Sequence, residues 1–121
     1  MSHVKQFSEE REAYNKVIAK YANRAQKTFF GLDAKTYESG ALDKKTKELL
    51  GFVASLTLRC DDFILYHLIE CHKAGVTSEE LAETVQIGML VGGSITIPHV
   101  RRAMKVWDEE LGGVSEKKAA A

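Results

Sequence analysis

The chain has 121 residues, a length that suits one domain, and we expect a single domain over residues 1–121 with its motif-bearing core at residues 43–111. Its 17 Lys and Arg residues balance its 17 Asp and Glu residues. Because no basic excess exists to attract a phosphate backbone, we expect no nucleic-acid partner.

The N-terminal segment 1–5 is polar and lacks the apolar stretch of a secretory signal peptide. No apolar run approaches the roughly 20 residues that a membrane-spanning helix needs. We therefore expect a cytoplasmic protein with no membrane partner. The two cysteines, Cys60 and Cys71, are too few for the disulfide framework of a small secreted domain.

The hydrophobic pattern predicts an all-α fold of about five helices, because no run alternates apolar and polar residues with the period of a strand. A first helix is expected over about residues 8–30, ended by Gly31 and followed by a connection over residues 32–42. Asp43 is a suitable N-cap for a second helix, over about residues 44–58.

A third helix is expected to be capped by Asp61 or Asp62 and to end near residue 74, directly before Gly75. Thr77 and Glu80 have the spacing of a capping box. They predict a fourth helix that runs to about residue 91, before a pair of glycines.

Pro98 suits the first turn of a fifth helix, which is expected to run to about residue 111. Residues 114–121 are expected to form a disordered tail. The second and fourth helices are apolar around most of their circumference. One small domain cannot hide that much apolar surface in its own core, so we expect a homo-oligomer.

The segment from Arg59 to His67 carries the side chains best suited to chemistry. Cys60 directly precedes a predicted helix start, where unpaired N–H groups and the helix dipole favour a thiolate. Arg59 adds to this effect, whereas Asp61 and Asp62 oppose it by like-charge repulsion, and the sequence leaves the balance open. His67 follows Cys60 by seven residues, about 10 Å of helix rise, so direct contact needs a bend or a bridging water.

Cys71 lies four residues after His67, on the same face of the third helix. An intrachain disulfide to Cys60 is not expected, because the two cysteines are eleven residues apart, about 16 Å along a helix, and a disulfide needs Cα atoms within about 7 Å. His67 and Cys71 alone do not make a metal site. We expect neither a metal nor a cofactor.

Glu48, twelve residues before Cys60, is a third candidate. If the second and third helices form an antiparallel hairpin, its carboxylate can approach the start or middle of the third helix. A carboxylate beside an imidazole orients the ring and raises its basicity, and such an imidazole can deprotonate a thiol. Each candidate also has an ordinary explanation, as a buried core cysteine, a satisfied core histidine and a solvated surface glutamate.

Glu48, then eleven residues, then Cys60 and His67 in the order C-x-x-F-x-x-x-H form a family-like pattern, which continues as AGVTSEELAE over residues 74–83. This segment resembles the core of the carboxymuconolactone decarboxylase/AhpD-like (alkylhydroperoxidase D) superfamily. Redox-active members carry a Glu, about eleven residues and C-x-x-C-x-x-x-H, followed by A-G-x-(T/S)-x-E-E-(I/L)-x-E. The resemblance implies an all-helical AhpD-like bundle, commonly assembled as a trimer or hexamer with the site near subunit contacts.

One position departs from the redox pattern, because Phe63 replaces the second cysteine of C-x-x-C. In redox members the two thiols cycle between dithiol and disulfide while they reduce peroxide or a partner peroxiredoxin, and that cycle cannot close here. Decarboxylase members lack the cysteine pair and keep the histidine, and residues 92–98 are similar to their G-G-x-P region.

Three functions follow from the resemblance. The first is an AhpD-like, thiol-dependent antioxidant protein, in which Cys60 is the nucleophile, His67 the proton relay and Glu48 the group that orients His67. The second is a decarboxylase-like lyase or isomerase in which His67 acts as general acid–base on a small acidic lactone. The third is an oligomeric binding module without catalysis.

Arg101 or Arg102 could bind the carboxylate of an acidic substrate, although a solvent-exposed helix face is the simpler interpretation of these two arginines.

Overall fold

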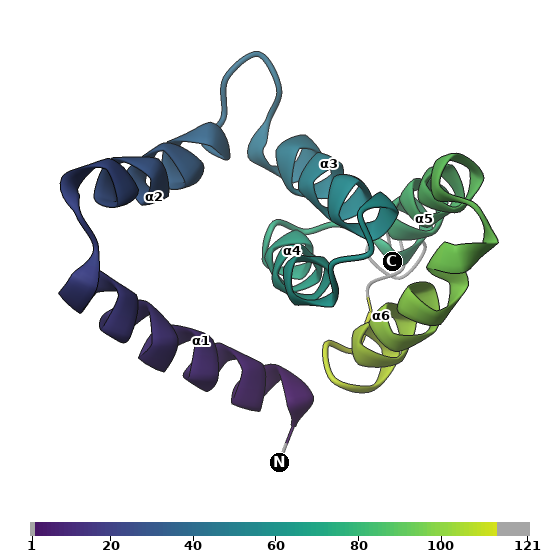
Figure 1. The fold of residues 1–121 in the computed structure, drawn as a ribbon. Coiled ribbons are helices and arrows are strands. Elements are labelled where there is room, and N and C mark those ends of the chain that lie inside the picture. Colours follow the sequence, from purple (N-terminus) through teal and green to yellow (C-terminus); the bar gives the residue numbers. More distant parts are fainter. Residues whose placement is uncertain (1, 114–121) are drawn as a thin grey trace.

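The computed structural model describes residues 2–113, and every regular element in that range is helical. The expected disordered tail at 114–121 lies outside the described residues. The described residues form six α-helices and one short 3-10 helix, and the α-helices can be followed in Figure 1: α1 (His3–Tyr21), α2 (Arg24–Thr36), α3 (Lys44–Thr57), α4 (Asp61–Lys73), α5 (Ser78–Gly92), η1 (Ser94–Thr96) and α6 (Ile97–Glu109).

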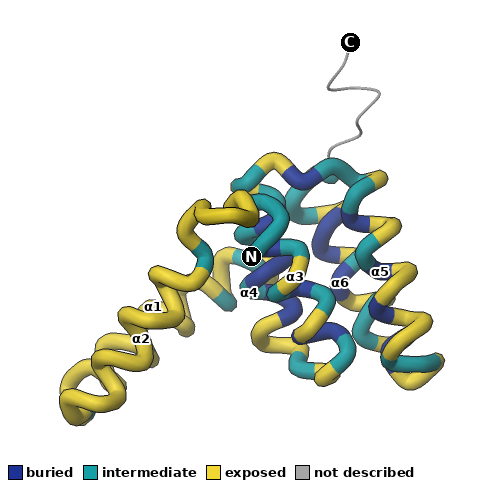
Figure 2. Tube along the Cα trace, turned by 90° about the horizontal axis from the view of Figure 1, so that it is seen from above, coloured by how far each residue is buried: buried dark blue, intermediate teal, exposed yellow. Residues whose placement is uncertain are grey.

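The all-α prediction is therefore confirmed, and the helices divide into a bundle and an arm. In the bundle, α3 packs against α4 and α5, and α4 packs against α6. The core between these helices is formed by side chains that are almost fully buried, among them Phe52, Leu56, Leu68, Leu81 and Trp107. The arm consists of α1 and α2, which contain no buried residue and extend away from the bundle (Figure 2).

The single helix expected over residues 8–30 is two helices in the structure, and the first begins earlier, at His3. Ala22 has an extended backbone, with φ −64° and ψ 133°, and ends α1. Asn23 then starts α2 through a capping box with Gln26, in which each side chain accepts a hydrogen bond from the other's backbone N–H. Gly31, the expected stop, lies inside α2.

The start of α4 also differs from the prediction. Its N-cap is Cys60, whose side chain makes no capping hydrogen bond, while Asp61 and Asp62 lie in the first turn. The other predicted signals are confirmed. Asp43 caps α3, and Thr77 and Glu80 form the capping box of α5. Pro98 lies in the first turn of α6, and Gly75 follows α4 with a positive φ of 85°.

Large apolar side chains remain exposed on α5 and on the arm. On α5, Leu90 is 85% exposed and Val91 is 73% exposed. On the arm, Tyr21 is 76% and Phe29 is 69% exposed. These apolar side chains lie outside the core of the bundle. Among the described residues, no helix combines the length and the apolar character that crossing a membrane would require.

Candidate functional site

A buried carboxylate and a buried imidazole meet where α3 packs against α4. Nδ1 of His67 lies 2.9 Å from Oε1 of Glu48, and the two residues are 5% and 1% exposed. A carboxylate offers only acceptors, so Nδ1 carries the proton and donates it to Glu48. This contact fixes the tautomer of His67 and leaves the lone pair of Nε2 to accept a hydrogen bond.

The second carboxylate oxygen of Glu48 is also paired. Lys44 lies one helical turn earlier on α3, and its Nζ lies 3.0 Å from Oε2 of Glu48. The hydrogen bond from Lys44 Nζ to Glu48 raises the pKa of Lys44 above its ordinary value. Glu48 is therefore held between a surface ammonium group and a buried imidazole, with no unsatisfied oxygen.

The other ring nitrogen of His67 faces Tyr37, which follows α2. The Tyr37 hydroxyl lies 3.4 Å from Nε2, and the two ring centroids are 5.1 Å apart. Since Nδ1 carries the ring proton, the phenol is the donor in this long hydrogen bond. Burial raises the pKa of Tyr37, and the nearby Asp33 and Glu48 raise it further, so the phenol keeps its proton at neutral pH.

Aromatic and small residues surround the buried imidazole. The ring centroid of Tyr66 lies 5.0 Å from that of His67, edge to face, and Phe63 stacks at 6.3 Å. On α3, Gly51 leaves the space that the imidazole fills, because a Cβ there would come within 2.7 Å of Cε1 of His67. Sequence reasoning missed both Gly51 and Tyr37. A glycine inside an otherwise apolar helix was a usable signal for close approach, whereas nothing local marked Tyr37.

Cys60 is not part of this hydrogen-bonded group. It is half-buried at the N-cap of α4, and its backbone N–H donates to the carbonyl oxygen of Ser55. Within the described residues, Nδ1 of His67 is hydrogen-bonded to Glu48 and Nε2 to Tyr37. No hydrogen bond among these residues joins His67 to the Cys60 sulfur. The position one turn before His67 on α4 is occupied by Phe63, whose ring stacks on the imidazole.

Cys71 belongs to the core. It is fully buried, and burial raises the pKa of its thiol to about 12, with Glu48 and Glu70 adding to the effect. It is therefore a protonated, unreactive thiol at neutral pH. Among the described residues, no group of three or more His, Cys, Asp or Glu side chains could hold a metal ion.

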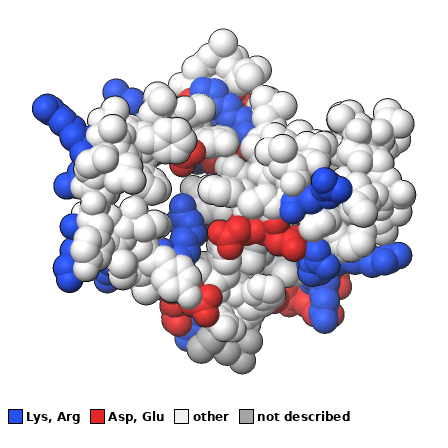
Figure 3. All heavy atoms as spheres, viewed as in Figure 1, with Lys and Arg blue, Asp and Glu red and all other residues white. Residues whose placement is uncertain are grey.

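A cleft of about 360 Å³ lies between the arm and α4, beside the aromatic residues that flank His67. Phe63 and Tyr66 form its wall on the side of His67, and Tyr14, Phe29 and Phe30 face them from the arm. Figure 3 shows the hollow between the arm and the bundle, with acidic and basic side chains at its edges. Its lining is suited to a small organic molecule.

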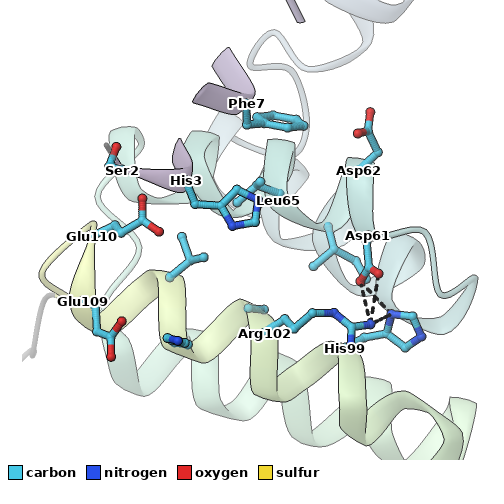
Figure 4. Close-up of a pocket in the computed structure, with 14 residues that line it drawn as sticks. Ser2, His3, Phe7, Asp61, Asp62, Leu65, His99, Arg102, Glu109 and Glu110 are labelled. Atoms are coloured by element: carbon cyan, nitrogen blue, oxygen red, sulfur yellow. Dashed lines mark hydrogen bonds and ion pairs between the residues drawn. The ribbon is translucent and has the colours of Figure 1, made fainter. Parts of the chain in front are cut away.

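A second polar cluster lies at the start of α4, where Asp61 directly follows Cys60. Asp61 binds Nδ1 of His99 at 2.7 Å and Nη2 of Arg102 at 3.0 Å, as the dashed lines in Figure 4 show. Partial burial works against ionisation of Asp61, but hydrogen bonds from His99 and Arg102 outweigh it and lower the pKa of the carboxyl. Arg102 is thus committed to Asp61, and Arg101 is exposed and faces no carboxylate in the described chain.

Residues 23–106 match the model of the carboxymuconolactone decarboxylase family. This chain belongs to that family. The match spans α2 to α6 and includes Glu48, His67, Tyr37 and Cys60. Glu48 and His67 therefore both lie within the part of the chain that matches the family.

Solved structures of the carboxymuconolactone decarboxylase family share the fold. A Thermotoga maritima protein of this family, described as possibly involved in antioxidative response, is 47% identical, with a TM-score of 0.82 over 86% of this chain and 88% of that one. A family protein from Legionella pneumophila is 26% identical, with a TM-score of 0.81 over 90% of this chain and 96% of that one. An uncharacterized protein in the cox locus of Paracoccus denitrificans is 27% identical over 81 residues, which are 67% of this chain and 73% of that one.

Proposed function

We propose that this protein is an enzyme that acts on a small organic molecule by proton transfer, with His67 as the general acid–base group and Glu48 as the carboxylate that orients it. The observation that carries the proposal is the 2.9 Å contact between Nδ1 of His67 and Oε1 of Glu48 in a buried position. It is supported by the cleft beside Phe63 and Tyr66, which is large enough for a small substrate.

The geometry favours acid–base chemistry because it leaves one nitrogen available for it. Nδ1 is committed to Glu48, and Nε2 is the atom that accepts or releases a proton. When Nε2 gains a proton, the ring becomes an imidazolium, and the Glu48 carboxylate stabilises that charge in a buried site where water does not screen it.

The reaction that gives the family its name fits this arrangement. In the decarboxylation of a carboxymuconolactone, the bond between the ring carbon and the carboxylate carbon breaks and CO₂ leaves. The electron pair of that bond stays on the lactone and takes up one proton. We assign the delivery of that proton to the His67 imidazolium, which returns to its neutral form and is reprotonated from solvent.

The test is the release of CO₂ from carboxymuconolactone by the purified protein and by two variants. His67→Ala removes the proton carrier and is expected to lower kcat by about 100-fold or more. Glu48→Gln keeps the shape but removes the charge that stabilises the imidazolium, and a smaller loss is expected. Wild-type kcat in His67→Ala would refute the proposal.

A second candidate is thiol-dependent reduction of peroxides through Cys60. Two observations favour it: the description of the Thermotoga relative, and the half-buried position of Cys60 at the N-terminus of α4. In this reaction the thiolate attacks the peroxide O–O bond, the alcohol leaves, and Cys60 becomes a sulfenic acid. An external thiol then forms a mixed disulfide with it, releasing water, and a second external thiol restores Cys60.

Peroxide consumption with dithiothreitol as the external thiol separates the two candidates. Cys60→Ser is expected to abolish peroxide reduction and to leave decarboxylation unchanged. If Cys60→Ser reduces peroxide as fast as the wild type, the thiol-based function is excluded. If the wild type reduces peroxide and does not decarboxylate the lactone, the second candidate replaces the first.

We also propose that the protein works as a homo-oligomer, for which the family resemblance implies a trimer or hexamer. The support is the exposed apolar surface of α5, where Ile87, Leu90 and Val91 are 58%, 85% and 73% exposed. Contiguous apolar surfaces of this kind usually mark protein interfaces. The arm adds a further apolar surface, because α1 and α2 bury no residue of their own.

A further inference from the structure

Tyr37 links the buried imidazole to the surface. Its hydroxyl is hydrogen-bonded to Nε2 of His67 at 3.4 Å, and the residue itself is half-buried while His67 is buried. The phenol oxygen is therefore placed to exchange a proton with Nε2. At 3.4 Å this is a long hydrogen bond, and hydrogen bonds of this kind in active sites often shorten when substrate binds.

The backbone that carries Tyr37 is fastened to α3 on both sides of the residue. Nζ of Lys47 donates to the carbonyl oxygen of Thr36 at 2.9 Å and to that of Glu38 at 2.7 Å. One residue further on, the Ser39 hydroxyl accepts from the backbone N–H of Lys44 at 3.0 Å. Because Lys47 donates to the carbonyl oxygens on both sides of Tyr37, it restrains the backbone at Tyr37.

Lys47 and the carboxylate that orients the acid–base group come from the same helix. Lys47 directly precedes Glu48 on α3, so one helix both orients His67 through Glu48 and positions Tyr37 through Lys47. The helix pairs that pack most closely in the described chain all lie within the bundle. The two hydrogen bonds of Lys47 join the end of α2 and the segment that follows it to α3.

We propose that Tyr37 is the proton-relay residue between His67 and the substrate, and that Lys47 is a positioning residue that holds Tyr37 against Nε2. This inference rests on the acid–base function proposed above. In the protonating direction, the Tyr37 O–H gives its proton to the substrate carbon, and the imidazolium N–H of His67 replaces it on the phenol oxygen. In the reverse direction both protons move back, so no net charge remains on Tyr37.

The phenol is chemically suited to this role. Burial raises the pKa of Tyr37, and Asp33 and Glu48 raise it further, so the hydroxyl stays protonated and can act as a donor near neutral pH. The ring is also fixed in place by its contact with His67, with centroids 5.1 Å apart and planes tilted by 43°.

The first test measures turnover of carboxymuconolactone by Tyr37→Phe, which keeps the ring and removes the hydroxyl. We expect kcat to fall by about 10-fold to 100-fold with KM little changed, and the pH profile of kcat to change shape. Tyr21→Phe is the matched control, because Tyr21 is 76% exposed on the arm, and it is expected to behave as the wild type. Wild-type kcat and pH profile in Tyr37→Phe would overturn the proposal.

The second test examines Lys47 without substrate. Ultraviolet absorbance of tyrosinate follows the titration of the four tyrosines, and Tyr37→Phe identifies the contribution of Tyr37. Lys47→Met removes both hydrogen bonds to the segment around Tyr37 and is expected to lower the pKa of Tyr37, because the phenol becomes more exposed to water. The loss of a nearby cation alone would have the opposite effect and raise this pKa. Lys47→Arg, which can still donate to both carbonyls, is expected to restore the wild-type curve, and Lys27→Met on α2 to leave it unchanged. An unshifted Tyr37 in Lys47→Met overturns the role of Lys47.

The two proposals fail in different ways. If His67→Ala is inactive while Tyr37→Phe has wild-type kinetics, the acid–base function stands and the relay through Tyr37 is wrong. If His67→Ala retains full turnover, the acid–base function is wrong and the relay falls with it. The titration of Tyr37 in Lys47→Met is independent of either outcome, because it requires no turnover.

Discussion

Gly51 lies so close to the imidazole of His67 that a β-carbon at Gly51 would come within 2.7 Å of Cε1 and 2.9 Å of each ring nitrogen. Real β-carbons do not approach other atoms this closely, so the ring can occupy its place only because position 51 has no side chain. The glycine on α3 thus sets where the imidazole of α4 lies, and with it the contact to Glu48 one turn earlier on α3.

Gly51→Ala is expected to push the His67 ring away from Glu48 and to lower kcat by at least about tenfold, because small displacements in a proton-transfer site are costly. The strain of overpacking costs about 1–3 kcal/mol, and the better helix propensity of alanine offsets about 1 kcal/mol of it. Thermal unfolding and lactone turnover measure the two effects.

Gly31→Ala is the matched control, because Gly31 is also helical and a β-carbon there would meet nothing within 4 Å. It is expected to raise the free energy of unfolding by up to about 1 kcal/mol and to leave turnover unchanged. If Gly51→Ala behaves like Gly31→Ala, the close packing of His67 against α3 does not matter for the reaction.

Glu48→Ala is expected to lower the free energy of unfolding by about 1–3 kcal/mol, because it leaves the buried Nδ1–H of His67 without an acceptor. Urea unfolding at neutral pH measures the change. Glu83→Ala, an exposed position on α5, is expected to stay within about 0.5 kcal/mol of the wild type. Equal unfolding free energies for Glu48→Ala and Glu83→Ala would contradict this expectation, because a water molecule would then replace the carboxylate as acceptor for His67 without loss of stability.

The signals that the sequence carried reliably are local ones. The capping box of Thr77 and Glu80 was identified by its three-residue spacing, and the N-cap Asp43 by its residue type directly before a predicted helix. The same kind of signal, Asn23 with Gln26, marked the break between α1 and α2, but the continuous apolar pattern across residues 8–30 concealed it.

The contacts that the sequence could not provide join residues that are distant in the chain. Asp61 was expected as a helix cap because local bonding is the default for an aspartate at a helix start. In the structure it binds His99 and Arg102, which are 38 and 41 residues away. Tyr37 is likewise 30 residues from His67, and no spacing rule connects a residue that follows one helix to the middle of another.

Leu90→Glu is expected to weaken or abolish self-association, because it places a charge on the most exposed apolar side chain of α5. Light scattering at micromolar concentration measures the assembly. Arg101→Glu, which places a glutamate at an exposed position of α6, is the control and is expected to leave the assembly intact. A monomeric wild type under these conditions would contradict the proposed homo-oligomer.

Stability in alkaline solution is expected to depend on Cys71. Burial raises the pKa of its thiol to about 12 in the folded chain, whereas the unfolded chain releases this proton near the ordinary value of 9.0. Above that value the unfolded state binds fewer protons than the folded state, so the contribution of Cys71 to stability is complete below pH 9 and is lost as pH rises towards 12. Each pH unit in this window costs up to about 1.4 kcal/mol.

Cys71→Ala removes this titration, so its stability is expected to fall less steeply than that of the wild type between pH 9 and 11, although it starts lower because a buried sulfur is lost. Cys60→Ala, at a half-buried position, is expected to keep the wild-type slope. Urea unfolding at a series of alkaline pH values gives both slopes. Burial also raises the pKa values of Tyr37 and Tyr66, but these tyrosines are present in all three proteins and contribute equally to each slope. If the plots of unfolding free energy against pH are parallel for Cys71→Ala and the wild type, the Cys71 thiol ionises as readily in the folded chain as in the unfolded one.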